Sequence, residues 1–225
     1  MEIDYSKYPM PHRFRHHTTP NAYFPVDELK VVPKSYPPLY ESIDWKEHYA
    51  DGKQPRYLDV GCAKGKFLLD YSELIPEENI LGIELRVAPV DWLRGVIEGE
   101  KLPNVSVLWY SVVNGLNFIE DNSIKKVFYL FPDPWSKKKH LKRRALNEKM
   151  LDEYDRVFRD DGELYLATDL LDVHEDQKEL IDNHPKFEYE EIATDDKWGL
   201  PVTNKEMFCR KENIKFYRMI CRKKQ

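Results

Sequence analysis

An aspartate between two prolines, followed by a dense basic run, is the part of the chain best suited to chemistry. Residues 131–144 read FPDPWSKKKHLKRR, and positions 137–144 hold six Lys or Arg residues and one His. Each proline fixes its own φ, so Asp133 lies on a stiff segment that aims its carboxylate. Lys and Arg side chains bind phosphates without reading sequence. The segment predicts a carboxylate site beside a nucleic-acid backbone; the plainer interpretation is a solvated first helical turn.

A glycine-containing turn and an acidic partner predict a nucleoside pocket. The stretch YLDVGCAKGKFLLD places Asp59, Gly61 and Gly65 between an expected strand and an expected helix. Glycines let the backbone approach a ligand closely, at the carboxyl ends of strands, where open α/β sheets bind ligands. Glu84 ends the next expected strand, where an acid can accept hydrogen bonds from both hydroxyls of a ribose. The plainer interpretation is that the glycines only make a tight turn.

The spacing of this turn separates the common adenosine cofactors. A dinucleotide site needs G-x-G-x-x-G, but Ala63 replaces the second glycine and the third is absent. A P-loop is excluded because no G-K-[S/T] follows. A D-x-G-x-x-x-G turn with an acid closing the second strand is typical of sites for S-adenosylmethionine. We therefore expect that cofactor.

Alternating apolar and helical segments must position these residues. We expect strands at 56–60, 79–84, 104–110, 125–131 and 163–168, helices at 64–74 and 87–99, a helix centred on Leu146, Met150, Tyr154 and Val157, and a helix ending before Pro185. Repeated strand–helix units predict a parallel sheet with helices on both faces. Two late strands, 187–193 and 214–222, with no helix between them, predict an antiparallel hairpin at one edge.

Composition limits the class of protein. The chain has 225 residues, 41% of them apolar, which is enough for a sizeable core, and seven of its prolines fall in the first 40 positions. We expect a basic, extended arm over residues 1–38 and one folded domain over 39–225. The sequence contains no run of about 18 apolar residues, so we expect no membrane helix. Three cysteines without CxxC spacing predict no structural metal and a reduced, cytoplasmic compartment.

Charge is segregated along the chain, whose formal net charge is −5. Acidic residues gather chiefly between 152 and 196. Basic residues gather in the arm (Lys7, Arg13 and Arg15), in the central run, and at the end of the chain (Arg210, Lys211, Lys215, Arg218, Arg222, Lys223 and Lys224). Such segregation allows a local positive field on an acidic protein.

The basic segment resembles the signature of the bacterial-type tRNA (guanine-N7-)-methyltransferases. GIELR (82–86) is similar to the family's ribose-binding strand end, ATD (167–169) to its acid after strand five, and TNKE (203–206) to its T-x-x-E element. These matches span residues 57–222. The resemblance implies a single-domain, Rossmann-like class I methyltransferase fold with a mostly parallel seven-stranded sheet and an antiparallel edge hairpin. It also implies a cytoplasmic monomer or homodimer that methylates guanosine N7 of tRNA, in the variable loop.

The resemblance also implies roles for individual residues. It implies catalytic roles for Asp133, Asp169 and Glu206, and binding of S-adenosylmethionine by Asp59, Gly61, Gly65, Glu84, Ser111 and Asp133. It implies binding of the tRNA by Lys137, Lys138, Lys139, His140, Lys142, Arg143, Arg144, Asp169, Thr203, Asn204, Lys205 and Glu206. The chain departs from the family at Lys139 (usually Arg), at Ala63 (usually Gly), and at Ser111 and Val112 (usually an acid and Ala).

Several alternatives stay open at this point. Methyltransferases that modify exocyclic amines carry [DNS]-P-P-[YFW] after strand four, which DPW resembles without the second consecutive proline. A non-catalytic RNA-binding protein on the same fold would explain Ala63, Ser111 and Val112, and an NAD-dependent oxidoreductase is a third class. Within the site, Asp169 could instead cap the following helix, and Thr203 with Glu206 could be ordinary loop residues.

Overall fold

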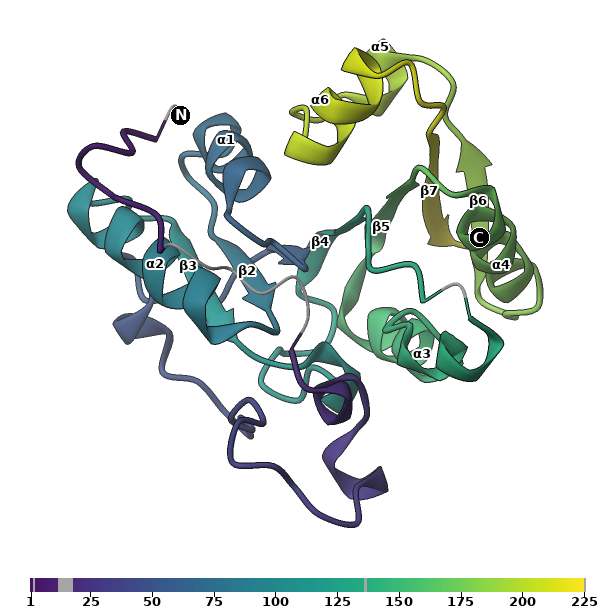
Figure 1. Ribbon diagram of the computed structural model, residues 1–225, viewed down its shortest axis with the longest axis horizontal. Coiled ribbons are helices and arrows are strands. Elements are labelled where there is room, and N and C mark those ends of the chain that lie inside the picture. Colours follow the sequence, from purple (N-terminus) through teal and green to yellow (C-terminus); the bar gives the residue numbers. More distant parts are fainter. Residues whose placement is uncertain (2, 12–17, 136, 225) are drawn as a thin grey trace. The chain divides into compact units, whose positions relative to one another are not determined.

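The computed structural model describes residues 1, 3–11, 18–135 and 137–224. The chain divides into two compact units, Met1–Phe118 and Ile119–Gln225. Its seven strands have the order β3-β2-β1-β4-β5-β7-β6 (Figure 1). Along the chain an α-helix follows β1, β2, β4 and β5, and a 3₁₀ turn at Val112–Asn114 (η4) follows β3. The expected α/β class and the mostly parallel, seven-stranded sheet are confirmed. Within the described residues, no helix is both long enough and apolar enough to cross a membrane.

The first unit contains three parallel strands and two helices. They are β1 (Tyr57–Val60), α1 (Lys66–Leu74), β2 (Ile80–Glu84), α2 (Val87–Gly99) and β3 (Val105–Trp109). Every residue of β1 and β2 is buried, as continuous apolar runs in a parallel sheet predict. The register pairs Val60 with Ile83 and Glu84 with Trp109, so the carboxyl ends of these strands meet at one edge.

The described part of the N-terminal arm packs on this unit. It forms 3₁₀ turns at Pro20–Tyr23 (η1) and Val26–Glu28 (η2), and a further turn at Trp45–Glu47 (η3) follows. Ala22 is fully buried. The Tyr36 hydroxyl donates a hydrogen bond to the Phe24 carbonyl over 2.8 Å. Arg13 and Arg15 lie outside the described residues, and the boundary at residue 38 stays a prediction.

The second unit holds the other four strands. They are β4 (Ile124–Leu130), β5 (Phe158–Thr168), β6 (Phe187–Glu191) and β7 (Tyr217–Lys223), with helices α3 (Glu148–Val157) and α4 (Leu171–Asp182). β4 and β5 are parallel, whereas β7 is antiparallel to both β5 and β6. The expected antiparallel pairing of the two late strands is therefore confirmed.

The expectation that no helix separates these late strands is wrong. Helices α5 (Asp195–Trp198) and α6 (Asn204–Lys211) lie between β6 and β7 (Figure 1). β7 also lies inside the sheet, between β5 and β6, so only one of the two strands is at the edge. Both helices are too short to show an apolar repeat: α6 buries only Glu206 and Cys209.

The helix expected around Leu146 begins later than its apolar spacing indicates. Asn147 is the N-cap of α3, and its side chain accepts a hydrogen bond from the Met150 N–H over 3.0 Å. The basic run before it forms a separate 3₁₀ helix, η5 (Lys138–Arg143). The basic run is therefore not the first turn of α3.

Candidate active site

The turn between β1 and α1 has the backbone that its glycines allow. Gly61 and Gly65 have φ values of +82° and +75°, and Ala63 also lies in the left-handed region at +51°. A Cβ added at Gly61 would meet nothing within 4 Å, whereas one at Gly65 would lie 2.6 Å from the Leu93 side chain. Gly61 therefore faces open space, and Gly65 is required by packing against α2.

Asp59 is a buried acid in β1, two residues before Gly61. It is 4% exposed, and its Oδ2 has no hydrogen-bond partner within the described structure. Burial, with a smaller contribution from the nearby charge of Glu84, raises the pKa of Asp59 to about 8. A buried oxygen without a partner is expected to receive one from a bound ligand.

Glu84 is buried at the end of β2, and its carboxylate is already hydrogen-bonded. Its Oε1 accepts from the backbone N–H and the Nε of Arg86 over 2.9 and 2.8 Å. Its Oε2 accepts from the Ala63 N–H and from Arg86 Nη2, each over 3.0 Å. The acid expected to hold a ribose thus ties β2 to the glycine turn, and Arg86 donates to both of its carboxylate oxygens.

Ser111, two residues beyond the end of β3, contacts the arm. Its Oγ donates to the Ala22 carbonyl over 2.6 Å, and Val26 N–H donates to the Asn114 side chain over 2.8 Å. The hydroxyl that stands in place of the family's acid therefore holds the arm against the first unit. Its role toward a cofactor stays a prediction.

The FPDPW segment at the end of β4 is strained on both sides of Asp133. Phe131 and Trp135 have φ values of +52° and +45°, which bulky residues rarely adopt and which cost about 1–3 kcal/mol each. Phe131 N–H donates to the Ala167 carbonyl over 2.7 Å, which fixes the segment to β5. Asp133 itself is exposed. Rigid presentation of an exposed carboxylate is what the two prolines predict.

The basic run places some cations in solvent and others against Trp135. Lys137, Lys138, Lys139 and Lys142 are exposed. The Arg143 guanidinium lies over the Trp135 ring at 4.7 Å, and the His140 ring meets that ring edge-on at 5.7 Å. Loss of solvation and the neighbouring cations Arg143, Lys139 and Lys137 lower the pKa of His140, which favours the neutral imidazole at pH 7.

Arg144 differs from the rest of the run because its contacts are internal. Its side chain is 14% exposed, Nε donates to the Pro134 carbonyl over 2.9 Å, and Nη1 pairs with Asp176 of α4. It thereby joins the FPDPW segment to α4. The expected contact of Arg144 with tRNA stays a prediction, and the described geometry gives this residue a positioning role.

Asp169 follows β5 and does not cap the next helix. The N-cap of α4 is Leu170, without any side-chain cap, and the Leu170 N–H donates to Thr168 Oγ1 over 3.2 Å. Asp169 Oδ2 instead pairs with Lys205 Nζ at 2.7 Å. This contact brings two of the expected site residues together.

Thr203 and Glu206 are the cap and the buried acid of α6. Thr203 Oγ1 accepts from the Glu206 N–H over 3.0 Å. Glu206 is 2% exposed, and its Oε1 accepts from Arg210 Nη2 at 2.6 Å and from Arg218 Nη2 at 2.5 Å. Asp195 accepts from the same two arginines, which lower its pKa to about 2. Thr203 and Glu206 are therefore ordered parts of a helix and not ordinary loop residues, and Asn204 is exposed at its start.

Sequence analysis missed Arg86 and Arg218 as parts of this site. Arg218 is buried in β7, where its guanidinium lies 4.8 Å from the Phe216 ring and 5.1 Å from the Trp198 ring. The available signal was that Arg218 is the one cation within FYRMIC (216–221), because a buried charge among apolar residues needs a partner. For Arg86, the signal was its position two residues after Glu84, the acid that ends β2.

The residues of the first unit fit an adenosine cofactor. The unpartnered Asp59 Oδ2 and the open space at Gly61 both accommodate a ligand at the carboxyl ends of the strands. The described residues contain no group of three or more His, Cys, Asp or Glu side chains that could hold a metal ion.

Comparisons with known proteins identify the family and the fold. A family model described as "Putative methyltransferase" matches residues 53–219. A tRNA (guanine-N(7)-)-methyltransferase of Aedes aegypti is 32% identical over 91% of this chain and 82% of its own. One of Synechococcus elongatus is 31% identical over 79% of this chain and 85% of its own. In fold alone, the chain is similar to the crystal structure of precorrin-6y C5,15-methyltransferase from Geobacter metallireducens, with a TM-score of 0.51, 17% identity, and coverage of 76% of this chain and 82% of that chain.

Proposed function

The chain belongs to the tRNA (guanine-N7-)-methyltransferase family, and we propose that it transfers a methyl group from S-adenosylmethionine to N7 of a guanosine in tRNA. The observation that carries this proposal is the exposed Asp133 on its strained segment, directly before a run of exposed lysines. We further propose that the guanosine lies in the variable loop and that the enzyme acts in the cytoplasm as a monomer or homodimer.

The chemistry needs positioning more than acid–base catalysis. Guanine N7 carries an in-plane lone pair, so no proton has to leave before it attacks, and no general base is required. S-adenosylmethionine, when bound, supplies the electrophilic methyl group; Asp59, Gly61 and Glu84 are the residues that would hold it. Fixing the base in line with that group can lower the barrier by roughly 7–11 kcal/mol.

Carboxylates then select the base and stabilise its charge. The methylated ring gains a positive charge, which carboxylates placed close to it stabilise. We propose that Asp133, Asp169 and Glu206 accept hydrogen bonds from the ring N–H and exocyclic amine of guanine. Adenine cannot donate in the same pattern, so it would make fewer hydrogen bonds with these acids and bind less well.

Two neighbouring contacts support this assignment of the acids. Lys205 holds Asp169, and the two arginines on Glu206 hold its carboxylate in one orientation before a base arrives. Acceptors that are already fixed need no reorganisation when charge develops. Lys137 to Lys139 and Lys142 would bind the phosphates on either side of the guanosine.

Replacing Asp133 tests the proposed role of this acid. We expect Asp133→Asn to lose at least about 100-fold in methyl transfer, because it removes one preorganised charge, while its melting temperature stays close to that of the wild type. Transfer of labelled methyl to unmodified tRNA gives the rate. Near-wild-type transfer in this variant would remove Asp133 from the mechanism.

Cofactor binding separates the enzyme from a non-catalytic RNA-binding protein on the same fold. We expect S-adenosylmethionine to raise the melting temperature of both the wild type and Asp133→Asn, since binding to the folded state stabilises it. A protein that melts at the same temperature with and without saturating cofactor, yet still binds tRNA, would favour the non-catalytic alternative.

A further inference from the structure

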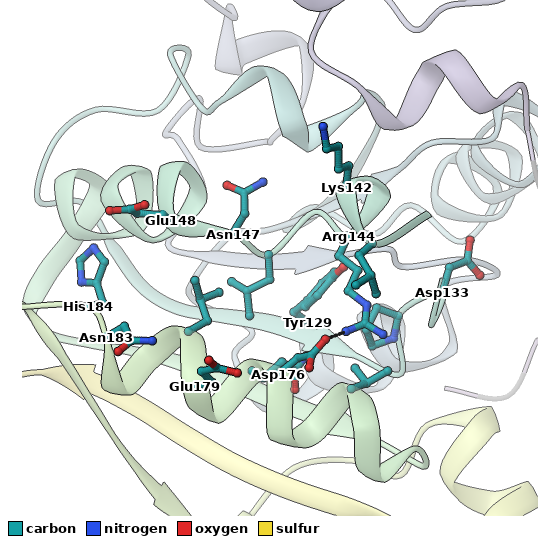
Figure 2. Close-up of a pocket in the computed structure, with 16 residues that line it drawn as sticks. Tyr129, Asp133, Lys142, Arg144, Asn147, Glu148, Asp176, Glu179, Asn183 and His184 are labelled. Carbon is teal, nitrogen blue, oxygen red and sulfur yellow. Dashed lines mark hydrogen bonds and ion pairs between the residues drawn. The ribbon is translucent and has the colours of Figure 1, made fainter. Parts of the chain in front are cut away.

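A cavity of about 560 Å³ in the second unit lies between α4 and the segment that joins β4 to α3. Val173, Gln177 and Leu180 are spaced at i, i+4 and i+7 and form its wall on α4. Leu141 and Leu146 contribute apolar surface from the joining segment. Figure 2 shows Asp176 and Glu179 of α4 on one side of the cavity and Lys142 and Asn147 of the joining segment on the other.

The cavity connects the proposed catalytic acid to the interior of the unit. Asp133 lies at one end and His184 at the other (Figure 2). Lys142, an exposed member of the basic run, lies at its rim. A ligand in the cavity would therefore sit beside the nucleotide that Asp133 contacts.

Gln177 lines the cavity, and its buried amide oxygen lacks a partner. Gln177 is 6% exposed, and its Oε1 has no hydrogen-bond partner within the described structure. Buried amide oxygens are normally hydrogen-bonded, so one left without a donor points to a bound group that supplies it.

Arg144 also lines the cavity and carries a buried donor. Within the described structure, Arg144 Nη2 makes no hydrogen bond. It forms an ion pair with Asp172 Oδ2 at 3.7 Å. Arg144 Nε also donates to the Pro134 carbonyl. A group bound to this guanidinium would therefore be connected to the FPDPW segment by the Arg144 side chain.

We propose that this cavity binds the base of a second tRNA nucleotide, next to the guanosine that is methylated. The edge of every base presents a donor beside an acceptor, which matches Gln177 Oε1 and Arg144 Nη2, and the leucines can pack against its faces. Lys142 at the rim suits the phosphate. The carboxylates of Glu148 and Glu179 also line the cavity, so they favour a base amine inside and keep phosphates out. The inference rests on the proposed function.

Filling the cavity tests the proposal. We expect Leu180→Trp to lower kcat/KM for tRNA about tenfold, the effect typical of removing one stacked base, while the KM for S-adenosylmethionine is unchanged. The matched control is Leu74→Trp, at an exposed leucine of α1, which should leave both constants unchanged. Wild-type kcat/KM in Leu180→Trp would overturn the proposal.

Gln177→Leu separates base binding from a structural role, because it should raise the melting temperature of the free protein while it lowers kcat/KM for tRNA. Removing an unpaired buried acceptor should raise the melting temperature of the free protein. If the acceptor serves tRNA, kcat/KM for tRNA should fall several-fold in the same variant. A higher melting temperature with unchanged kcat/KM would overturn the proposal.

These outcomes are distinguishable from failure of the proposed function. If the wild type forms 7-methylguanosine in tRNA and both variants retain its kcat/KM, only the second nucleotide site is wrong. If the wild type forms none, the proposed function fails, and this inference fails with it.

Discussion

At the scale of single residues, the acids of the site differ in what holds them. Asp59 is buried with one oxygen unpartnered in the described structure, whereas Glu84 and Glu206 are buried with their carboxylates held by arginines. Asp133 is exposed on a rigid backbone. Four carboxylates of similar chemistry therefore have different tasks, set by their surroundings.

The pH dependence of stability should report the burial of Asp59. Its pKa rises from 3.8 in an unfolded chain to about 8 in the fold, so between these values only the folded protein retains the proton. Stability from this group is therefore present at low pH and lost as pH rises from about 4 to 8.

We expect Asp59→Asn, which stays neutral, to melt progressively higher than the wild type as pH rises from 5 to 8. Thermal melts across that range measure the difference, with Asp91→Asn at an exposed aspartate as the control. A difference in melting temperature that does not change with pH would show that Asp59 is not protonated in the folded protein.

Residue types and spacing were enough to find the acids but not their partners. The turn around Gly61, the strand-ending Glu84 and the Asp133 segment each carry a local pattern. Arg86 and Arg218 become partners only through the fold, because spacing along the chain does not specify which side chains meet.

At the scale of elements, the segment between β6 and β7 contains helices that the sequence pattern does not predict. T-x-x-E at residues 203–206 resembles a family motif, yet in the fold its threonine is the N-cap of a helix. Thr203 caps α6 and thereby fixes the position of Glu206. The long strand–helix units were predictable from their apolar periods, whereas a helix of eight residues gives too few repeats.

Substitutions at Thr203 separate capping from contact with the base. We expect Thr203→Ala to lose about 1 kcal/mol of stability and to reduce methyl transfer, since the backbone N–H of Glu206 loses its acceptor. Thr203→Ser keeps the hydroxyl and should retain both properties. Denaturant unfolding and methyl transfer measure the two effects. A loss of transfer in the Ser variant without a loss of stability would instead place the Thr203 methyl group against the substrate.

At the scale of the whole molecule, the basic residues fall into two classes that the sequence does not separate. At the C-terminus, Arg210, Arg218 and Arg222 pair with acids and Lys223 lies 3.5 Å from Asp155, while Lys211 and Lys215 are exposed. The central run instead presents its lysines to solvent. Exposed cations are available to phosphates, so tRNA binding should depend on the central run.

The salt dependence of tRNA binding tests this division. We expect the double variant Lys138→Ala/Lys139→Ala to bind tRNA more weakly and to lower the slope of log K against log salt by about two, one for each phosphate that a lysine no longer neutralises. The double variant Lys53→Ala/Lys101→Ala, at exposed lysines of the first unit, is the control. Equal slopes in the two double variants would place the tRNA on another surface.

The most direct test of the central claim is transfer of labelled methyl from S-adenosylmethionine to unmodified tRNA, followed by nucleoside analysis. The proposed function predicts label in 7-methylguanosine alone, from wild-type protein and not from Asp133→Asn. Label in an exocyclic-amine product would keep the fold and cofactor but contradict the assigned reaction. No label, with tRNA still bound, would contradict catalysis itself.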